Sequence, residues 1–190
     1  MKTRITLAMA MLLLLAVTPA HAESGYSGNV NGIIGAKRID NDNIDHRNLT
    51  LIGIMYDFNV AEWPFNLAID GLFAWDTKEI GGVDVDVGTF ELGFGVRKDF
   101  RIPDTDLLPF VGAGLSFNAL GVDRDDVDDD GDTALGRYFT TGAFWNFDNG
   151  FNLGLVYRYT RADVELELEG TEFRTRAGGH HYALMFGNRW

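Results

Sequence analysis

The residues with the clearest capacity for chemistry form an acidic run between positions 123 and 132. Asp126, Asp128 and Asp130, followed by Gly131, match the start of an EF-hand-like loop, in which oxygen ligands surround Ca²⁺ and a glycine allows a sharp turn. The twelfth position of such a loop would be Arg137 instead of the bidentate glutamate, which excludes a complete EF-hand. Two interpretations stay open: a weak site for Ca²⁺ or Mg²⁺, or a solvated loop whose like charges repel. The candidate ligands are Asp126, Asp128, Asp130 and Asp132.

A second set of charged residues lies within segments that otherwise alternate between apolar and small side chains. If these segments form a narrow barrel, their charges must be paired or hydrated, because an isolated buried charge is costly. Asp70 and Glu91 would lie at similar heights on neighbouring strands, so we expect Arg158 or a proton to relieve their repulsion. Paired carboxylates also serve glycosidases, but we favour structural pairing. The predicted lumen charge network is Asp70, Glu91, Arg97, Arg158 and Arg189.

His180 and His181 are the remaining candidates for metal binding or catalysis. Adjacent residues on a strand point to opposite faces, so this pair is poorly placed to chelate one metal ion. Nucleophilic catalysis needs a nucleophile beside a base, and Ser116, the serine expected inside a barrel, lies on a strand distant from the histidines. We therefore predict no catalytic residues, and no cofactor beyond a weakly bound Ca²⁺ or Mg²⁺.

These candidates must be positioned by β-strands, because the dominant hydrophobic period of the chain is two residues. In residues 65–76, one face carries Phe65, Leu67, Ile69 and Phe73, and the other carries mostly small or polar residues. The same alternation is clear in residues 89–98, 109–119 and 151–160, and weaker versions begin at Tyr26, Leu49, Tyr138 and Arg176. Eight segments of about ten residues match the length of a tilted membrane strand.

The links between these segments alternate in length. Short links cover residues 59–64, 99–106 and 148–150, and the last contains the Asn-Gly pair typical of hairpins. Longer, more charged links cover residues 39–48, 77–88, 121–136 and 162–175. Short turns at one rim and long loops at the other are typical of outer-membrane barrels. Within the last link, residues 164–173 alternate apolar and acidic side chains, which indicates a protruding hairpin that is either solvated or free to pair with a partner strand.

Alternation alone also fits a soluble barrel such as a lipocalin, whose apolar face points inward. Three features favour the membrane orientation. The apolar face carries more bulky side chains than an eight-stranded interior can hold, and the opposite face is rich in Gly, Ala, Thr and Asn. Lysine, expected on a soluble exterior, occurs after residue 22 only at positions 37, 78 and 98. Aromatic residues lie near the segment ends, as in the interfacial girdles of membrane barrels.

Composition and the first residues indicate an exported protein. The chain of 190 residues has a net charge of -12, which argues against nucleic acid as the main partner, and it contains no cysteine for a disulfide or thiol nucleophile. A basic start, an apolar run from Ile5 to Val17 and the sequence Ala20-His21-Ala22 predict a secretory signal peptide over residues 1–22. The second predicted unit, residues 23–190, is an outer-membrane β-barrel domain.

The last segment adds a more specific feature, because Tyr182, Leu184, Phe186 and Trp190 share one face and the chain ends on an aromatic residue. In this pattern the chain resembles the small outer-membrane β-barrel proteins of Gram-negative bacteria, the OmpA/OmpX-type barrels, over the whole of residues 23–190. The resemblance implies an all-β, eight-stranded antiparallel up-and-down transmembrane barrel with both termini in the periplasm. It also implies that these four residues form an assembly signal read by the barrel-assembly machinery and periplasmic chaperones. Asn188 departs from that signal, since an apolar residue is usual there.

The resemblance and the residues together lead to a functional expectation. We expect a monomer in the outer membrane, in contact with outer-membrane lipid and lipopolysaccharide and without a nucleic-acid partner. The leading hypothesis is a non-enzymatic protein with a structural or surface-interaction role, whose lumen is largely plugged by polar side chains. A small-solute porin-like channel is the first alternative, and a lipid A-modifying outer-membrane enzyme is the second.

Overall fold

The computed structural model describes residues 27–39, 48–59, 63–80, 83–124, 127–168 and 171–190. For residues 80, 83–84, 123–124, 127–130, 164–168 and 171–175 it describes the backbone alone. Within these ranges, no helix is long and apolar enough to cross a membrane. The predicted signal peptide, residues 1–22, lies outside the described residues and stays a prediction.

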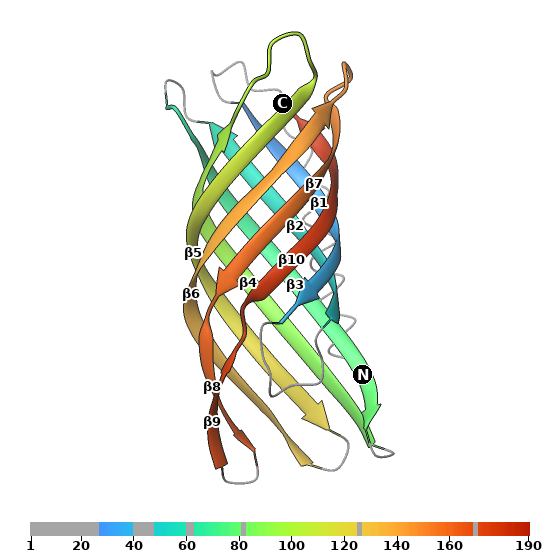
Figure 1. The fold of residues 1–190 in the computed structure, drawn as a ribbon, viewed down its shortest axis with the longest axis vertical. Coiled ribbons are helices and arrows are strands. Elements are labelled where there is room, and N and C mark those ends of the chain that lie inside the picture. Colours follow the sequence, from blue (N-terminus) through green and yellow to red (C-terminus); the bar gives the residue numbers. More distant parts are fainter. Residues whose placement is uncertain (1–26, 40–47, 60–62, 81–82, 125–126, 169–170) are drawn as a thin grey trace.

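Eight antiparallel strands form a closed barrel, in the order β1-β10-β7-β6-β5-β4-β3-β2 (Figure 1). They are β1 (Ser27–Arg38), β2 (Asn48–Asn59), β3 (Asn66–Ile80), β4 (Val83–Asp99), β5 (Leu107–Arg124), β6 (Val127–Asn146), β7 (Phe151–Arg161) and β10 (Gly179–Arg189). Between β7 and β10, β8 (Asp163–Leu168) and β9 (Thr171–Arg176) pair only with each other. Closure satisfies the backbone groups within the wall, as crossing a bilayer requires. The predicted eight-stranded up-and-down barrel is confirmed.

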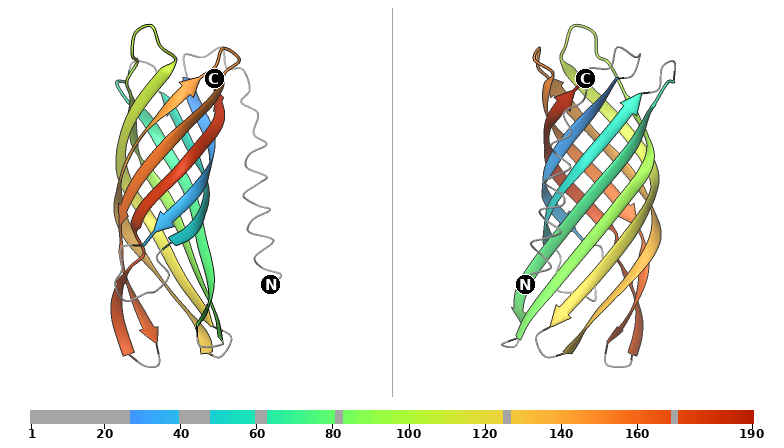
Figure 2. Two further views of the ribbon diagram at one scale, coloured as in Figure 1. Left: turned by 45° about the vertical axis from the view of Figure 1, so that its right-hand side comes forward. Right: turned by 180° about the vertical axis from the view of Figure 1, so that it is seen from behind.

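The strands are steeply tilted, as Figure 2 shows from two sides. Following the paired residues once around the wall from Gly28 leads back to β1 at Arg38, ten residues further along the same strand. This offset of ten residues is the stagger of the strands. In a closed barrel the stagger is linked to the strand tilt, and together with the number of strands they set the width of the barrel. This stagger leaves an interior wide enough for large side chains to meet across it.

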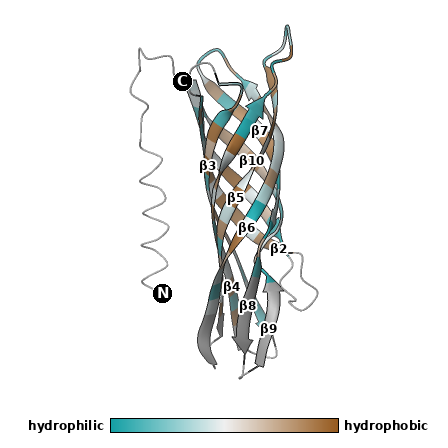
Figure 3. Cartoon of the chain, turned by 90° about the vertical axis from the view of Figure 1, so that its left-hand side faces the viewer, coloured by the Kyte–Doolittle hydropathy of each residue, from teal (hydrophilic) through white to brown (hydrophobic). Residues whose placement is uncertain are grey.

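Alternate side chains point into the barrel and out of it, as the period of two predicts. On β5, Leu115 and Phe117 are exposed, whereas Ser116 and Asn118 beside them are buried. Figure 3 shows the same alternation as bands of hydrophobic and hydrophilic residues along the strands. The exposed apolar residues of the wall include Ile34, Ile69, Phe94, Val96, Val111, Phe139, Leu153, Leu155, Leu184 and Phe186. The exterior is therefore the apolar surface, as expected for a membrane barrel.

The expectation of long loops was wrong for two of the four long links, whereas the hairpin expected within residues 162–175 is present. β3 and β4 stay paired up to Ile80 and Val83, and β5 and β6 stay paired up to Arg124 and Val127. Most of residues 162–175 forms the β8–β9 hairpin. Past the apolar belt, β4 keeps valines at alternate positions, as strands favour, whereas the start of β6 is rich in aspartate, which strands disfavour, and stays paired through its ladder with β5. These hairpins project at the end opposite the C-terminus (Figure 1). In the remaining long link, residues 39–48, the positions 40–47 lie outside the described ranges.

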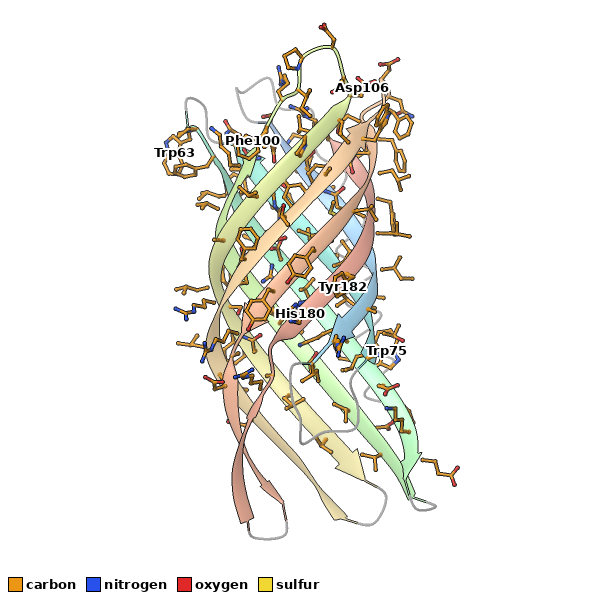
Figure 4. The ribbon with its side chains drawn as sticks, in the orientation of Figure 1. Trp63, Trp75, Phe100, Asp106, His180 and Tyr182 are labelled. Atoms are coloured by element: carbon orange, nitrogen blue, oxygen red, sulfur yellow. The ribbon has the colours of Figure 1, made fainter. Side chains whose placement is uncertain are left out.

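Aromatic side chains mark two levels on the outside of the barrel. Trp63 and Phe100 lie near the end that carries the short turns, and Trp75 lies toward the long hairpins (Figure 4). Trp145 and Phe151 are also exposed near the short turns. Aromatic girdles lie at both interfaces of outer-membrane barrels, whose short turns face the periplasm. The wall between the two levels is therefore the membrane-spanning part, and the long hairpins are extracellular.

The interior contains bulky apolar layers as well as the small and polar residues that the pattern indicated. Toward the short turns, the buried rings of Phe110 and Phe144 stack with centroids 4.8 Å apart. Gly142 makes room for them, because a Cβ at that position would lie 2.7 Å from the Phe110 ring. A second apolar layer toward the long hairpins consists of Leu49, Val87, Leu120, Ala162 and Ala177. Charged side chains lie among these apolar residues, and the guanidinium carbon of Arg97 is 5.2 Å from the centroid of the Phe110 ring.

Arginine substitutions at two outward leucines test the membrane orientation. Leu155 is 64% exposed in the middle of β7, whereas Leu135 is 84% exposed on β6, beyond the last residue that pairs with β7. We expect Leu155→Arg to lower the free energy of unfolding by about 2–4 kcal/mol and Leu135→Arg by about 0–1 kcal/mol, since the cost of an arginine falls from midplane to interface. The measurement is urea unfolding from lipid vesicles. Equal and small losses would show that both positions face water.

Candidate functional site

A continuous chain of buried ion pairs runs along the inside of the barrel. In its part nearer the short turns, Arg97 lies between two aspartates: its Nη1 donates to Oδ2 of Asp57 at 2.6 Å, and its Nη2 donates to Oδ1 of Asp70 at 3.0 Å. All three side chains are fully buried. Asp57 also accepts hydrogen bonds from the amides of Asn29 at 3.0 Å and Asn66 at 3.1 Å. The charges are thus neutralised and hydrogen-bonded, which burial requires.

Arg158 on β7 extends the chain across the lumen. Its Nη1 donates to Oδ2 of Asp70 at 2.6 Å, its Nε donates to Oε1 of Glu91 at 2.8 Å, and its Nη2 lies 2.5 Å from the same oxygen. Oε1 also accepts a hydrogen bond from Thr160 at 2.9 Å. Because β7 and β3 lie on opposite sides of the wall, one guanidinium joins the two sides and contacts both carboxylates.

The chain ends toward the long hairpins in a group that includes a lysine and a histidine. His181 Nε2 lies 3.5 Å from Oε2 of Glu91. Lys37 is almost completely buried, and its ammonium donates to the hydroxyl of Thr89 at 3.0 Å and to the carbonyl of Ala177 at 2.7 Å. The strands β1, β4 and β10 and the segment before β10 therefore all contribute polar groups to this level of the lumen.

A tyrosine and a patch of glycines support Arg158. The guanidinium carbon lies 3.5 Å from the centroid of the Tyr138 ring, which is a cation–π contact. The ring fits because Gly93, Gly95 and Gly114 face the lumen without side chains. A Cβ at Gly114 would lie 2.8 Å from the Tyr138 ring, and one at Gly93 would lie 2.5 Å from Arg158 Nη2. The glycines therefore provide the space in which the tyrosine and the arginine meet.

A pocket of about 210 Å³ opens at the short-turn end of the lumen. Asn66 on its wall donates a hydrogen bond to Asp99 at 2.9 Å, and Arg101 and Arg189 also line it. Just inside the barrel, both amide atoms of Asn31 lack a hydrogen-bond partner among the described residues. Buried polar groups are normally satisfied by protein or water, so the lumen offers binding positions for water near this mouth.

Four of the five residues predicted for the lumen network, Asp70, Glu91, Arg97 and Arg158, lie in this chain of contacts. The fifth, Arg189, lines the pocket at the mouth. In the described part of the protein its side chain makes no hydrogen bond or ion pair with the residues of this charge chain.

The sequence analysis missed Asp57 and Lys37, because the alternation in β1 and β2 is less regular than in later strands. Asp57 has the same parity as the buried Leu49 and Met55, and Lys37 the same parity as the buried Ile33. Extending the alternation along these strands would have assigned both charged residues to the lumen.

The acidic run is a strand where the structure describes it. Asp130 and Asp132 pair with Val122 and Leu120 on β5, so this part is not the loop that the sequence suggested. Extended backbone directs successive side chains to opposite faces and does not wrap around one ion. Asp126 lies outside the described residues, and only the backbone of Asp128 and Asp130 is described. The weak cation site therefore stays a prediction; among the described side chains no group of three potential metal ligands occurs.

The residues of the predicted assembly signal lie on the outer surface. Tyr182, Leu184 and Phe186 are exposed, and Trp190 stacks on Tyr56 with ring centroids 5.4 Å apart. They form an apolar strip next to the seam where β10 meets β1. Their recognition by assembly machinery stays a prediction.

Removing the cation that joins Asp70 and Glu91 should destabilise the barrel strongly. We expect Arg158→Gln to lower the free energy of unfolding by about 3–5 kcal/mol, because it leaves buried carboxylates without their partner. Arg101→Gln, at an exposed position, should change it by less than about 0.5 kcal/mol. Urea titrations in vesicles measure both, and equal effects would contradict the buried pairing.

A methyl group added to the glycine patch should disturb the position of Arg158. We expect Gly93→Ala to cost about 1–3 kcal/mol of unfolding free energy, since its Cβ collides with Arg158 and the lumen is overpacked. Gly88→Ala is the matched control, because a Cβ there has nothing within 4 Å, and it should be neutral or stabilising by up to about 1 kcal/mol. Urea titrations in vesicles measure both variants. An unchanged free energy of unfolding in Gly93→Ala would show that Arg158 has room to move.

Comparison with known proteins agrees with this architecture. The family model for the outer membrane protein beta-barrel domain matches residues 7–180. No curated protein sequence matches the chain. Among solved structures, Neisserial surface protein A is similar with 18% identity and a TM-score of 0.59, covering 87% of this chain and 96% of that one.

Two further structures are similar. Ail, the attachment invasion locus protein of Yersinia pestis, solved in complex with the heparin analogue sucrose octasulfate, has 14% identity and a TM-score of 0.58 over 88% of this chain and 99% of that one. OprG from Pseudomonas aeruginosa has 10% identity and a TM-score of 0.58 over 87% and 95%. At these identities the three structures establish the fold alone. A closed barrel with an apolar exterior, matched by the family model over most of its length, identifies the chain as a member of the outer membrane protein β-barrel family, located in the outer membrane.

Proposed function

We propose that this protein is a non-enzymatic outer-membrane barrel with a structural or surface-interaction role, whose lumen does not conduct solutes. The observation that carries the proposal is the position of Arg158. Its guanidinium contacts Asp70 and Glu91 from the opposite wall, and its side chain is only 3% exposed. Opening a pathway along the axis would require breaking these buried charge pairs, which is costly.

Apolar side chains packed along the charge chain support a closed lumen. Nearer the short turns, the Phe110 ring of the Phe110–Phe144 stack lies 5.2 Å from the guanidinium carbon of Arg97, and the buried Met55 pairs with Asp70. Toward the long hairpins, Leu49 and Leu120 are almost completely buried. Apolar constrictions of this kind exclude water and ions from narrow pores. The charged and apolar layers are complementary barriers, since each disfavours the solutes that the other would admit.

The long hairpins support a role at the cell surface. β3 with β4, and β5 with β6, extend as paired strands beyond the aromatic level marked by Trp75. In outer-membrane barrels the longer connections face the outside of the cell. Paired strands hold their side chains in a fixed arrangement, which suits recognition of a partner better than an unstructured loop.

The polar groups of the lumen do not form a catalytic arrangement. Ser116 Oγ accepts a hydrogen bond from Asn118 at 2.9 Å, and its strand lies three strands from β10, which carries His181. His181 is buried against Glu91, away from the pocket at the mouth. An activated nucleophile needs a base within hydrogen-bond reach and access to substrate. These positions support a structural role for the lumen residues.

A small-solute channel is the second candidate, and unpartnered polar atoms inside the barrel favour it. Both amide atoms of Asn31 and both of Asn152 are buried without a hydrogen-bond partner among the described residues. Water that satisfies these groups would enter from the pocket at the mouth. A channel would then require only the central charge chain and the layer beyond it to rearrange.

Single-channel recording in planar bilayers separates the two functions. We expect no discrete openings from the wild-type protein, because the charge chain crosses the lumen. Openings should arise in Arg158→Ala, which removes the side chain that spans the lumen, and not in Arg101→Ala, which removes an exposed charge at the rim of the mouth pocket. Migration on a gel with and without boiling checks that each variant is folded. Wild-type openings whose ion selectivity changes in Arg158→Glu would overturn the closed lumen in favour of the channel.

A further inference from the structure

The outer face of the barrel carries a cluster of exposed arginines on one sector, near the extracellular end of the membrane-spanning wall. They are Arg38 on β1, Arg137 on β6 and Arg161 on β7. Arg161 has the same parity as the exposed Leu155, and Arg137 the same parity as the exposed Phe139, so both point away from the lumen. Arg161 follows Tyr159, an outward residue of the aromatic belt, by two positions, which places it about 7 Å further along the strand.

Two of these arginines are direct neighbours. Arg137 and Arg161 face each other across the β6–β7 pair and are the last residues that these strands pair. Like charges directly opposite on a sheet repel and destabilise the pair. Neither side chain, nor that of Arg38, has a hydrogen bond or ion pair within the described part of the chain, and the nearby Asp163 instead lies 3.9 Å from Arg176. Among the described side chains, no acidic group pairs with either arginine to offset the repulsion.

His180 and two tyrosines adjoin the arginines on the same sector. His180 pairs with Arg38 on one side and with Tyr159 on the other, and it points outward (Figure 4). Its Nδ1 lies 2.9 Å from the hydroxyl of Tyr157, and its ring contacts that of Tyr159 with centroids 4.9 Å apart. Aromatic and basic side chains together are typical of the level where lipid headgroups meet the acyl chains.

Near the extracellular end, the described basic residues of the outer wall are confined to this sector. On the other side, the outward residues near the same end are uncharged: Thr50, Trp75, Phe90 and Phe117. The arrangement is the more distinctive because the whole chain carries a net charge of -12. A positive sector on an acidic protein, facing the outer leaflet, is complementary to an anionic headgroup of that leaflet.

We propose that Arg137 and Arg161, with Arg38 and His180 beside them, bind the phosphate groups of lipopolysaccharide, at its lipid A moiety. Guanidinium groups form bidentate, charge-assisted hydrogen bonds with phosphate. A phosphate between Arg137 and Arg161 supplies the missing counter-charge and converts their repulsion into two attractive contacts. The tyrosines and His180 contact the sugar and the first carbons of the acyl chains. The site lies on the outer wall and is independent of whether the lumen conducts.

Binding of defined lipids to the purified protein in non-ionic micelles tests this site. The probes are lipid A with both phosphates, lipid A with its phosphates removed, and phosphatidylglycerol, each measured by native mass spectrometry. We expect the wild type to bind phosphorylated lipid A at least about tenfold more tightly than the dephosphorylated form, a difference of 1.4 kcal/mol. R137Q/R161Q should lose most of this preference. K98Q/R101Q, which removes the same charge at the periplasmic end, should retain it.

Several outcomes would overturn the proposal. They are an unchanged preference in R137Q/R161Q, an equal loss in K98Q/R101Q, and binding of phosphatidylglycerol as tight as that of phosphorylated lipid A, which would indicate a general attraction of anionic lipid. A second measurement does not depend on added lipid. If the two arginines repel each other, Arg161→Gln alone should leave the urea midpoint in non-ionic micelles unchanged or raise it. A lowered midpoint would show that Arg161 is stabilised within the protein itself.

Discussion

Each strand of a closed membrane barrel has two faces that meet different surroundings, and this constraint determines most of the structure. The outward residues contact lipid, where bulky apolar side chains are favoured, and the inward residues share a narrow interior. Charges that enter this interior have little access to bulk water, so they are stable only when they neutralise one another. The chain from Asp57 through Arg97, Asp70 and Arg158 to Glu91 is the arrangement that meets this requirement.

The width of the lumen and the size of its side chains are matched by glycine. Arg158 reaches the opposite wall, and the Tyr138 ring lies beneath its guanidinium. Neither would fit if Gly93 or Gly114 carried a side chain. The glycine-rich face of the strands is therefore not simply the face that is free of large residues. It is the space into which the large residues of other strands project, so the interior is filled instead of hollow.

The two ends of the barrel differ in a way that agrees with a role at the cell surface. The short-turn end has a polar pocket lined by Asp99 and Arg189, whereas the other end continues as paired hairpins beyond the membrane. On the outer wall, Arg137 and Arg161 lie opposite each other with no ion pair among the described side chains. The lumen therefore satisfies its charges internally, and the outer wall presents charges that require an external partner. This contrast between lumen and outer wall is the reason for proposing that the protein's interactions are at its surface and in the surrounding leaflet.

The sequence by itself determined the strand number, the inward and outward faces and the membrane orientation, because a period of two and the choice of side chains are local properties. It also indicated that Asp70 and Glu91 need a common cation. Only the tertiary structure showed that Asp57 and Lys37 belong to the lumen, that Arg189 stays at the mouth, and that two expected loops continue as strands. It also placed Arg137 opposite Arg161. These features depend on the register and stagger of strands far apart in the chain, and register is set by the closure of the whole barrel rather than by any one segment.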